Sequence, residues 1–168
     1  MARVADHIAI ANRNHSTLAT LLATGAAHSE WVATVAFYKA IHVIEAVFVT
    51  TSMGNSVDHE DRTFKLKRDR RFESLFTHYR PLKEASTIAR YLQDQHGRFK
   101  VFSDYLTPER VHSELIRHRL HQIESSASRF LSAEVMVGLA LSAGLPPFVA
   151  ADEVATSRKV SRKGSQDA

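Results

Sequence analysis

The sequence contains no cysteine and few residues that break helices. The absence of cysteine excludes disulfide bonds, thiolate zinc sites and cysteine nucleophiles. Six Gly and four Pro among 168 residues are too few for a loop-rich β-sandwich or a disordered chain. A chain of this length can bury one sizeable core, so we expect a single domain with at most a tail.

Long apolar runs are also scarce. The longest candidate, residues 135–145, is interrupted by glycine and serine and is shorter than the roughly 18 residues that a membrane span needs. The first ten residues lack the apolar centre of a signal peptide, because Asp6 and His7 interrupt them. We therefore expect a soluble, cytoplasmic protein that makes no contact with a membrane.

The net charge of +4 is unevenly distributed along the chain. Residues 62–71 carry a net charge of +5 and the last twelve residues carry +3, so the remainder is acidic. Concentrated basic charge suggests a polyanion such as RNA as the partner, although a solvated helix face would show the same pattern. The residues of the first run that we expect to contact RNA are Arg62, Lys67, Arg68, Arg70 and Arg71.

Apolar side chains recur at three- and four-residue spacing along most of the chain, which is typical of amphipathic helices. Pro81 either kinks a helix or begins a new one, and Thr107-Pro108-Glu109 is a strong helix start. The predicted helices cover residues 5–23, 30–50, 59–79 and 82–95, followed by a long helix from Pro108 into the 130s.

With no strand alternation and no internal repeat, these patterns predict an all-α fold, an antiparallel bundle of four or five helices. We assign the bundle to residues 1–145 and a disordered basic tail to residues 146–168. The segment 30–50 is apolar on most sides and should be the most buried helix. If the ring of Trp31 is buried there, replacing it with Ala should cost about 3 kcal/mol.

Ten histidines suggest metal binding, but the ligand sets are incomplete. Glu109 and His112 have the spacing of a di-iron motif, and His42 and Glu45 have the reverse order, with no further pair to complete the site. The sequence also lacks a zinc-protease motif, a serine nucleophile elbow and a phosphate-binding glycine loop. We predict no metal and no cofactor.

A polar stripe crosses the otherwise apolar segment 30–50. Tyr38, His42 and Glu45 share one helix face. One interpretation is a hydrogen-bonded core cluster tied to Arg62 or Arg90, because buried polar groups need partners. The other interpretation is a polar pocket at the mouth of the bundle.

Two arginine–histidine spacings suggest a different chemistry. Arg71 precedes His78, and Arg90 precedes His96, with five or six residues between. A guanidinium can hold a phosphate while an imidazole transfers a proton, as metal-free RNA cleavage requires. With 22 basic residues and ten histidines, such spacings also arise by chance.

The residues HSEWVATVAFYKAIHVIEAV, at positions 28–47, resemble the central helix of small prokaryotic HEPN-like proteins, in which Trp, Phe-Tyr, His and Glu-Ala recur in this order. The resemblance spans roughly residues 5–130. It continues in His59-x-x-Arg62 and in Tyr79-x-x-Leu82-x-x-x-Ser86-x-x-Ala89-Arg90-Tyr91.

This resemblance implies an antiparallel helical bundle that commonly dimerises. Many HEPN domains are metal-independent endoribonucleases of toxin–antitoxin and defence systems, and others are non-catalytic partners of larger enzymes. The catalytic signature is Arg-x(4–6)-His, usually with Asn, Asp or His after the Arg. Here Phe and Tyr follow Arg71 and Arg90, and residues 117–121 are one residue short of the spacing.

Two hypotheses follow. The first is an RNA-cleaving or RNA-binding homodimer, in which attack by the ribose 2′-OH would be assisted by Arg90 and one of His59, His42 or His96. The second is a non-catalytic dimeric module for a partner protein encoded nearby, with the polar residues forming a structural network. The members of that predicted polar cluster are Tyr38, Glu45, Tyr79 and Tyr91.

Overall fold

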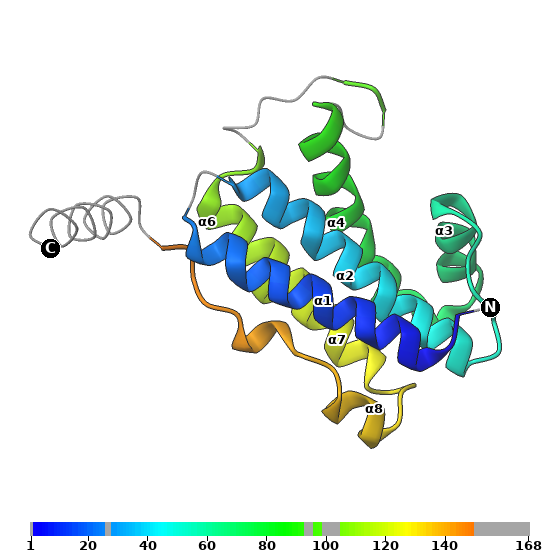
Figure 1. Cartoon of the computed structure of the whole chain (residues 1–168). Helices are drawn as coiled ribbons and strands as arrows, with labels where there is room; N and C mark the ends of the chain where they lie inside the picture. The colour runs from blue at the N-terminus through cyan, green and yellow to red at the C-terminus, as the bar shows by residue number, and fades with distance from the viewer. Residues whose placement is uncertain (1, 26–27, 93–95, 99–104, 150–168) are drawn as a thin grey trace, which may run out of the picture.

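The computed structural model of this chain describes residues 2–25, 28–92, 96–98 and 105–149. Within these ranges every regular element is helical (Figure 1). The predicted all-α fold is therefore confirmed. Most of the predicted tail, from residue 150 onward, lies outside the described residues, as do residues 99–104.

The first two helices form an antiparallel pair. Helix α1 (Val4–Ala23) and helix α2 (Ser29–Thr50) begin and end within one residue of the predicted bounds. The apolar face of α1 buries Leu18 and Leu22 completely, because their spacing directs both side chains toward α2. Figure 1 shows the two helices lying side by side and running in opposite directions.

Helix α2 is the central helix of the bundle, as predicted. It packs against α1, α4 and the long C-terminal helix, so most of its side chains are buried. One position differs from the expectation: Trp31 is 56% exposed. The cost of about 3 kcal/mol expected for a buried ring therefore does not apply to Trp31.

By length and composition α2 is long and apolar enough to cross a membrane, which the search for apolar runs did not anticipate. In the structure 78% of its most apolar window is buried by other parts of the chain. A helix that is apolar on most sides is also what the centre of a bundle requires. No other helix of the described ranges meets the same criteria.

The predicted helix over residues 59–79 is wrong in one respect, because the chain turns in the middle of that segment. Helix α3 (His59–Arg68) ends at Asp69, whose backbone is extended. A short 3₁₀ turn, η2 (Arg70–Phe72), then leads into α4 (Glu73–Tyr91). The Asp69 carboxylate accepts a hydrogen bond from the backbone N–H of Arg71 at 2.9 Å, which stabilises the turn.

Helix α4 continues through Pro81, which lies inside it and does not begin a new segment. The helix ends at Tyr91, before the predicted end near residue 95, because Leu92 adopts a left-handed conformation with φ of 54°. A left-handed residue ends an α-helix by turning the chain away from its axis.

The last long helix starts where the sequence indicated. The Thr107 hydroxyl accepts a hydrogen bond from the backbone N–H of Arg110 at 3.3 Å. Helical structure then runs without a break through α6 (Pro108–Arg110), the π-helical stretch η3 (Val111–Leu120) and α7 (His121–Ala127). It ends a few residues before the predicted end in the 130s.

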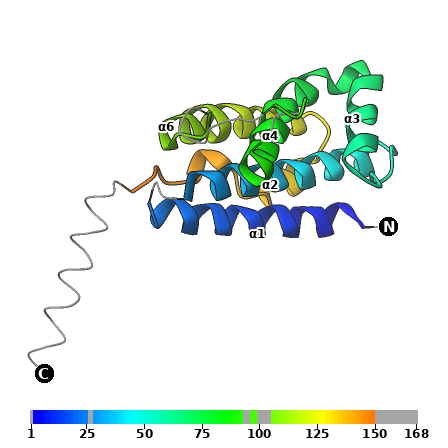
Figure 2. The same ribbon diagram turned by 90° about the horizontal axis from the view of Figure 1, so that it is seen from above.

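These helices make a bundle in which successive long helices alternate in direction, while α3 lies to one side at one end (Figures 1 and 2). The chain then passes through α8 (Ala133–Val137) and the 3₁₀ turn η4 (Ser142–Gly144). The Asn12 side chain fastens this segment to α1. Its Nδ2 donates to the Gly138 carbonyl at 2.7 Å, and its Oδ1 accepts from the Ala140 N–H at 2.8 Å.

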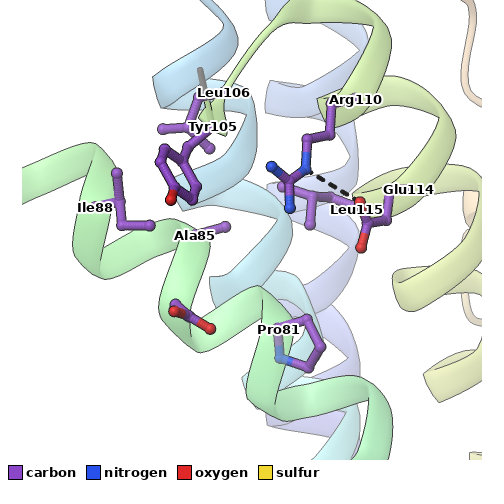
Figure 3. A pocket seen from close by; sticks show the side chains of 9 residues that line it. Pro81, Ala85, Ile88, Tyr105, Leu106, Arg110, Glu114 and Leu115 are labelled. Carbon is purple, nitrogen blue, oxygen red and sulfur yellow. Dashed lines mark hydrogen bonds and ion pairs between the residues drawn. The ribbon is translucent and has the colours of Figure 1, made fainter. Parts of the chain in front are cut away.

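A small pocket lies between α4 and the start of the long C-terminal helix (Figure 3). Its volume is about 100 Å³, well below the roughly 300 Å³ at which pockets begin to hold typical ligands. Arg110 at its rim is already paired with Glu114 at 3.1 Å. The pocket therefore has neither the room nor the available charge of a binding site.

Candidate functional site

A buried ion pair joins α2 to α3. Arg62 Nε donates to Glu45 Oε1 at 2.7 Å, and the two side chains are 8% and 3% exposed. The other carboxylate oxygen accepts from the backbone N–H of Ser56 at 2.8 Å. Of the two partners that the sequence offered for this polar stripe, Arg62 and Arg90, the structure joins Arg62 to Glu45. Arg62, however, was expected to face RNA with the rest of its basic run, and its burial in this pair corrects that expectation.

His59 lies next to this pair and has a defined protonation state. Its Nδ1 is 2.9 Å from Arg62 Nη1. Because a guanidinium can only donate, Nδ1 must accept, so the single ring proton of neutral His59 is on Nε2. Burial lowers the pKa of His59, and the charges of Arg62, Lys83 and Arg90 lower it further. The ring is therefore neutral at pH 7.

This arrangement limits what His59 can do chemically. The one lone pair of the neutral ring, on Nδ1, already accepts a hydrogen bond from Arg62, and Nε2–H can only donate. The charges of Lys83 and Arg90 act on the same ring. The group thus presents donors and positive charge, which suits the binding of an anion better than the removal of a proton.

His42 belongs to an inner extension of this cluster. Its Nδ1 lies 3.1 Å from Nδ1 of His7, and His7 Nε2 lies 3.1 Å from Asn55 Oδ1. Burial lowers the pKa of His42 to about 4, and the neighbouring His7 and Arg62 contribute. His42, one of the predicted catalytic residues, is therefore a neutral member of a hydrogen-bonded core network.

The predicted tyrosines are divided between two places. The ring of Phe37 contacts those of Tyr38, His59 and Tyr79, with centroids 5.5–5.7 Å apart. Tyr79 is fully buried, which raises the pKa of its hydroxyl. Tyr91 lies at the far end of α4, 60% exposed, and does not join the cluster.

Four residues of the predicted RNA-binding run are exposed around the end of α3 and η2. Lys67 lies 5.4 Å from the ring centroid of Phe76 on α4. Arg71 is held by Asp69, with Nη2 and Oδ2 2.6 Å apart. The exposed members of the run are Lys67, Arg68, Arg70 and Arg71.

A pocket of about 350 Å³ lies beside this run, and its lining includes three arginines and Glu73. Arg70 and Arg71 come from η2, and Arg129 comes from the turn that follows α7. The pocket also contains His78, so the structure brings the predicted pair of Arg71 and His78 to one site. Arg129 has no sequence signal that could have placed it there, because it lies far along the chain.

Further cations follow one stripe of α4. Arg80, Lys83 and Arg90 share a face of the helix, since they recur at multiples of its turn. Arg80 and Arg90 are exposed and Lys83 is half-buried. Lys83 Nζ lies 3.4 Å from the Thr63 hydroxyl on α3, so the stripe adjoins the α3 side of the cluster.

The second predicted pair consists of Arg90, near the end of α4, and His96. His96 is exposed in the described stretch 96–98, separated from α4 by residues outside the described part. In the ranges that the structure covers, no group of three or more His, Asp or Glu side chains is placed to hold a metal ion.

A second buried ion pair was missed by the sequence analysis. Lys39 on α2 donates to Glu124 Oε1 on α7, and both side chains are almost completely buried. Glu124 Oε2 accepts from Ser142 twice, from its N–H at 2.8 Å and its hydroxyl at 2.6 Å. Burial lowers the pKa of Lys39, and the charge of Glu124 opposes that shift. The pair joins three distant segments of the chain.

Comparison with known protein families, with curated proteins and with solved structures finds no match to this chain.

Proposed function

We propose that this protein is a cytoplasmic, HEPN-like helical bundle that binds RNA as a homodimer, through a basic surface formed by α3, η2 and α4. The observation that supports the proposal most is the exposure of Lys67, Arg68, Arg70 and Arg71 together on one turn of the chain. The stripe of Arg80, Lys83 and Arg90 extends this positive surface along α4. Contacts of this kind hold the phosphate backbone without reading its sequence.

Binding is favoured over cleavage for a specific reason. Cleavage by attack of the ribose 2′-OH needs a base with a free lone pair. In the neutral form of His59 that lone pair accepts from Arg62. His42 is half-buried and hydrogen-bonded to His7, and its pKa is lowered to about 4, which makes it a weak base. His78 Nδ1 likewise lies 3.5 Å from Arg119 Nη1. We infer that the polar cluster is a scaffold that holds α3 against α2.

Anisotropy of a labelled single-stranded RNA tests the proposal, with titrations at several salt concentrations between 50 and 200 mM. Binding should weaken steeply with salt, because each neutralised phosphate releases counterions. Replacing the four exposed cations with Gln should reduce the slope of log K against log salt by about 3, at about 0.7 for each lost single-strand contact. The substituted residues are Lys67, Arg68, Arg70 and Arg71.

A matched pair of variants controls for net charge. Arg68→Gln with Arg70→Gln removes two charges from the basic surface. Arg3→Gln with Arg13→Gln removes two exposed charges, one just before α1 and one within it. Only the first pair should change the salt slope. Equal effects, or no binding by the unmutated protein at 50 mM salt, would contradict the proposal. Incubating RNA with the protein in EDTA should leave the RNA intact.

A non-catalytic module for a partner protein is the second candidate. Val137 in α8 is 89% exposed and Leu141 is 42% exposed, although both are apolar. Exposed apolar side chains on one segment favour a protein contact. Loss of a co-purifying partner on replacing Val137 with Asp, with RNA binding absent throughout, would support this alternative.

A further inference from the structure

Three large aromatic side chains on α2 and α4 are exposed. Trp31 is 56% exposed, Tyr38 is 36% exposed and Tyr91 is 60% exposed. Trp31 and Tyr38 are two helical turns apart and therefore share one face of α2. Of the three, Trp31 shares a pocket with Arg90 of α4, and Tyr91 lies against the same guanidinium.

A pocket of about 200 Å³ lies between Trp31 on α2 and Arg90 on α4. Its remaining lining includes Thr34 and Ala89, so its walls are largely apolar, with Glu30 at one side. This volume is smaller than the pockets that take whole drug-sized molecules, so a single planar ring is the largest occupant that we consider. We call it the Trp31 pocket.

Arg90 is held in position at this pocket. Its Nε donates to the Ser86 carbonyl at 3.1 Å, and its guanidinium lies 5.0 Å from the ring centroid of Tyr91. A guanidinium fixed in this way can lie against an aromatic ring or bind a phosphate without losing much further freedom. The positive charge of Arg90 also helps to lower the pKa of His59.

We propose that the Trp31 pocket receives a nucleobase of single-stranded RNA. The base would stack on the Trp31 indole, and the adjoining phosphates would follow Arg90, Lys83 and Arg80 along α4. This inference rests on the proposed RNA binding and adds a class of substrate to it. Aromatic side chains beside a cationic track are typical of proteins that bind single strands, because every base has a face that can stack.

A duplex should bind this surface less well than a single strand. Bases in a double helix are stacked on one another and cannot enter a pocket without unpairing. Phosphate contacts alone would not make that distinction, since both forms carry a charged backbone. Preference for the single strand is therefore the property that separates the Trp31 pocket from the basic surface in general.

The chain has only one tryptophan, so its fluorescence reports on this pocket directly. We would titrate the protein with a 12-nucleotide oligoadenylate, with a 12-base-pair RNA duplex and with AMP, and would excite the indole at 295 nm. The single strand should quench the fluorescence with the same midpoint as its binding measured by anisotropy. The duplex should bind with little quenching.

Variants of Trp31 provide the second arm. Trp31→Ala should lower the affinity for the single strand about 5- to 150-fold, the range found when a stacking aromatic is removed. Trp31→Phe should retain most of the affinity. Leu141→Ala, at an exposed apolar position on the C-terminal segment, serves as the control. Because Trp31 is mostly exposed, circular dichroism should show all three variants folded.

The outcomes separate the two proposals. Binding of RNA without quenching, and with Trp31→Ala unimpaired, would overturn the Trp31 pocket and leave the RNA-binding surface intact. No RNA binding at 50 mM salt would overturn the proposed function. In that case the AMP titration decides the Trp31 pocket alone. Saturable quenching of the indole by AMP would support the pocket, and no quenching up to 10 mM AMP would overturn it. A dimer in sedimentation that Trp31→Ala dissociates would show that a second copy covers this face, which also overturns the inference.

Discussion

Replacing Lys39 with Met should destabilise the protein in a way that depends on pH. The substitution leaves the Glu124 carboxylate buried, with Ser142 as its only remaining hydrogen-bond partner among the residues that the structure describes. A buried carboxylate that has lost its ion pair takes up a proton instead of remaining charged. Removing one partner of a buried pair commonly costs about 3–5 kcal/mol.

The cost of protonating Glu124 sets how much stability the Lys39→Met variant loses. An ordinary glutamate has a pKa of about 4.3, and each pH unit above that value adds about 1.36 kcal/mol to the cost of holding it neutral. Lys39→Met should therefore lower the free energy of unfolding by about 3.7 kcal/mol at pH 7 and by about 1 kcal/mol at pH 5. The folded state of this variant binds the extra proton, so its stability falls as the pH rises.

The converse variant should show the opposite slope. Glu124→Gln keeps an oxygen that accepts from Ser142, so only the Lys39 ammonium loses its partner. Burial already lowers the pKa of Lys39, and Glu124 is the group that opposes this. The folded variant should release the lysine proton, so its stability should rise with pH.

Urea denaturation at pH 5, 6, 7 and 8 measures both slopes. Lys67→Met, on an exposed lysine, is the control and should change stability by less than about 0.5 kcal/mol at every pH. A cost below about 1 kcal/mol at pH 7, or the same slope for both Lys39→Met and Glu124→Gln, would show that water reaches the pair. The reasoning from burial would then be wrong.

Three further predictions concern other polar contacts. Because the pKa of His42 is lowered to about 4 in the folded protein, the unfolded chain binds this proton at a higher pH than the folded protein does. The free energy of unfolding should therefore fall by about 1–2 kcal/mol, after allowance for partial exposure, as the pH drops from 6.5 to 4. In urea titrations, His42→Asn should flatten that change. Arg62→Met should cost about 3–5 kcal/mol in thermal melts, against less than about 0.5 kcal/mol for Arg68→Met, and equal costs would refute the buried pair. Asn12→Ala should speed hydrogen exchange across residues 133–149, and unchanged exchange would show that its two hydrogen bonds do not hold the segment.

The sequence predicted helix ends well where the signals are local. The start at Thr107-Pro108 is a cap followed by a residue that fits only the first turn, and no distant contact is needed to specify it. The turn at Asp69 was missed because the segment contains neither Gly nor Pro and its apolar spacing continues across the turn. Tertiary burial of Phe72 accompanies that turn, and periodicity does not report tertiary burial.

The exposure of Trp31 was missed for a related reason. Helical spacing shows that Trp31 and Val35 share a stripe, but it cannot show whether a neighbouring helix covers that stripe. The structure covers the other sides of α2 with α1, α4 and the C-terminal helix. The uncovered end of the stripe is where the Trp31 pocket lies.

Two ion pairs show where sequence reasoning about polar residues stops. For Glu45 the sequence could narrow the partner to Arg62 or Arg90, because each lies on a recognisable helix face, and the structure shows Arg62. Lys39 and Glu124 belong to helices far apart in the sequence, and nothing in either segment identifies its partner. Pairs of the second kind become visible only when the order of helices in space is known.

The burial of Arg62 and Lys39 changes how the composition bears on function. A chain with 22 basic residues and ten histidines contains many arginine–histidine spacings, and any of them could be taken for a nuclease. In the structure Arg62 donates hydrogen bonds to Nδ1 of His59 and to the Glu45 carboxylate. The basic run 62–71 therefore contributes Arg62 to the core, whereas Lys67, Arg68, Arg70 and Arg71 remain on the surface. A histidine whose lone pair is occupied by a permanent donor is a hydrogen-bond donor, whatever residues surround it in the sequence. Arginine and histidine residues whose number suggests RNA cleavage are therefore arranged, at Arg62 and His59, in a way that favours the binding of an anion.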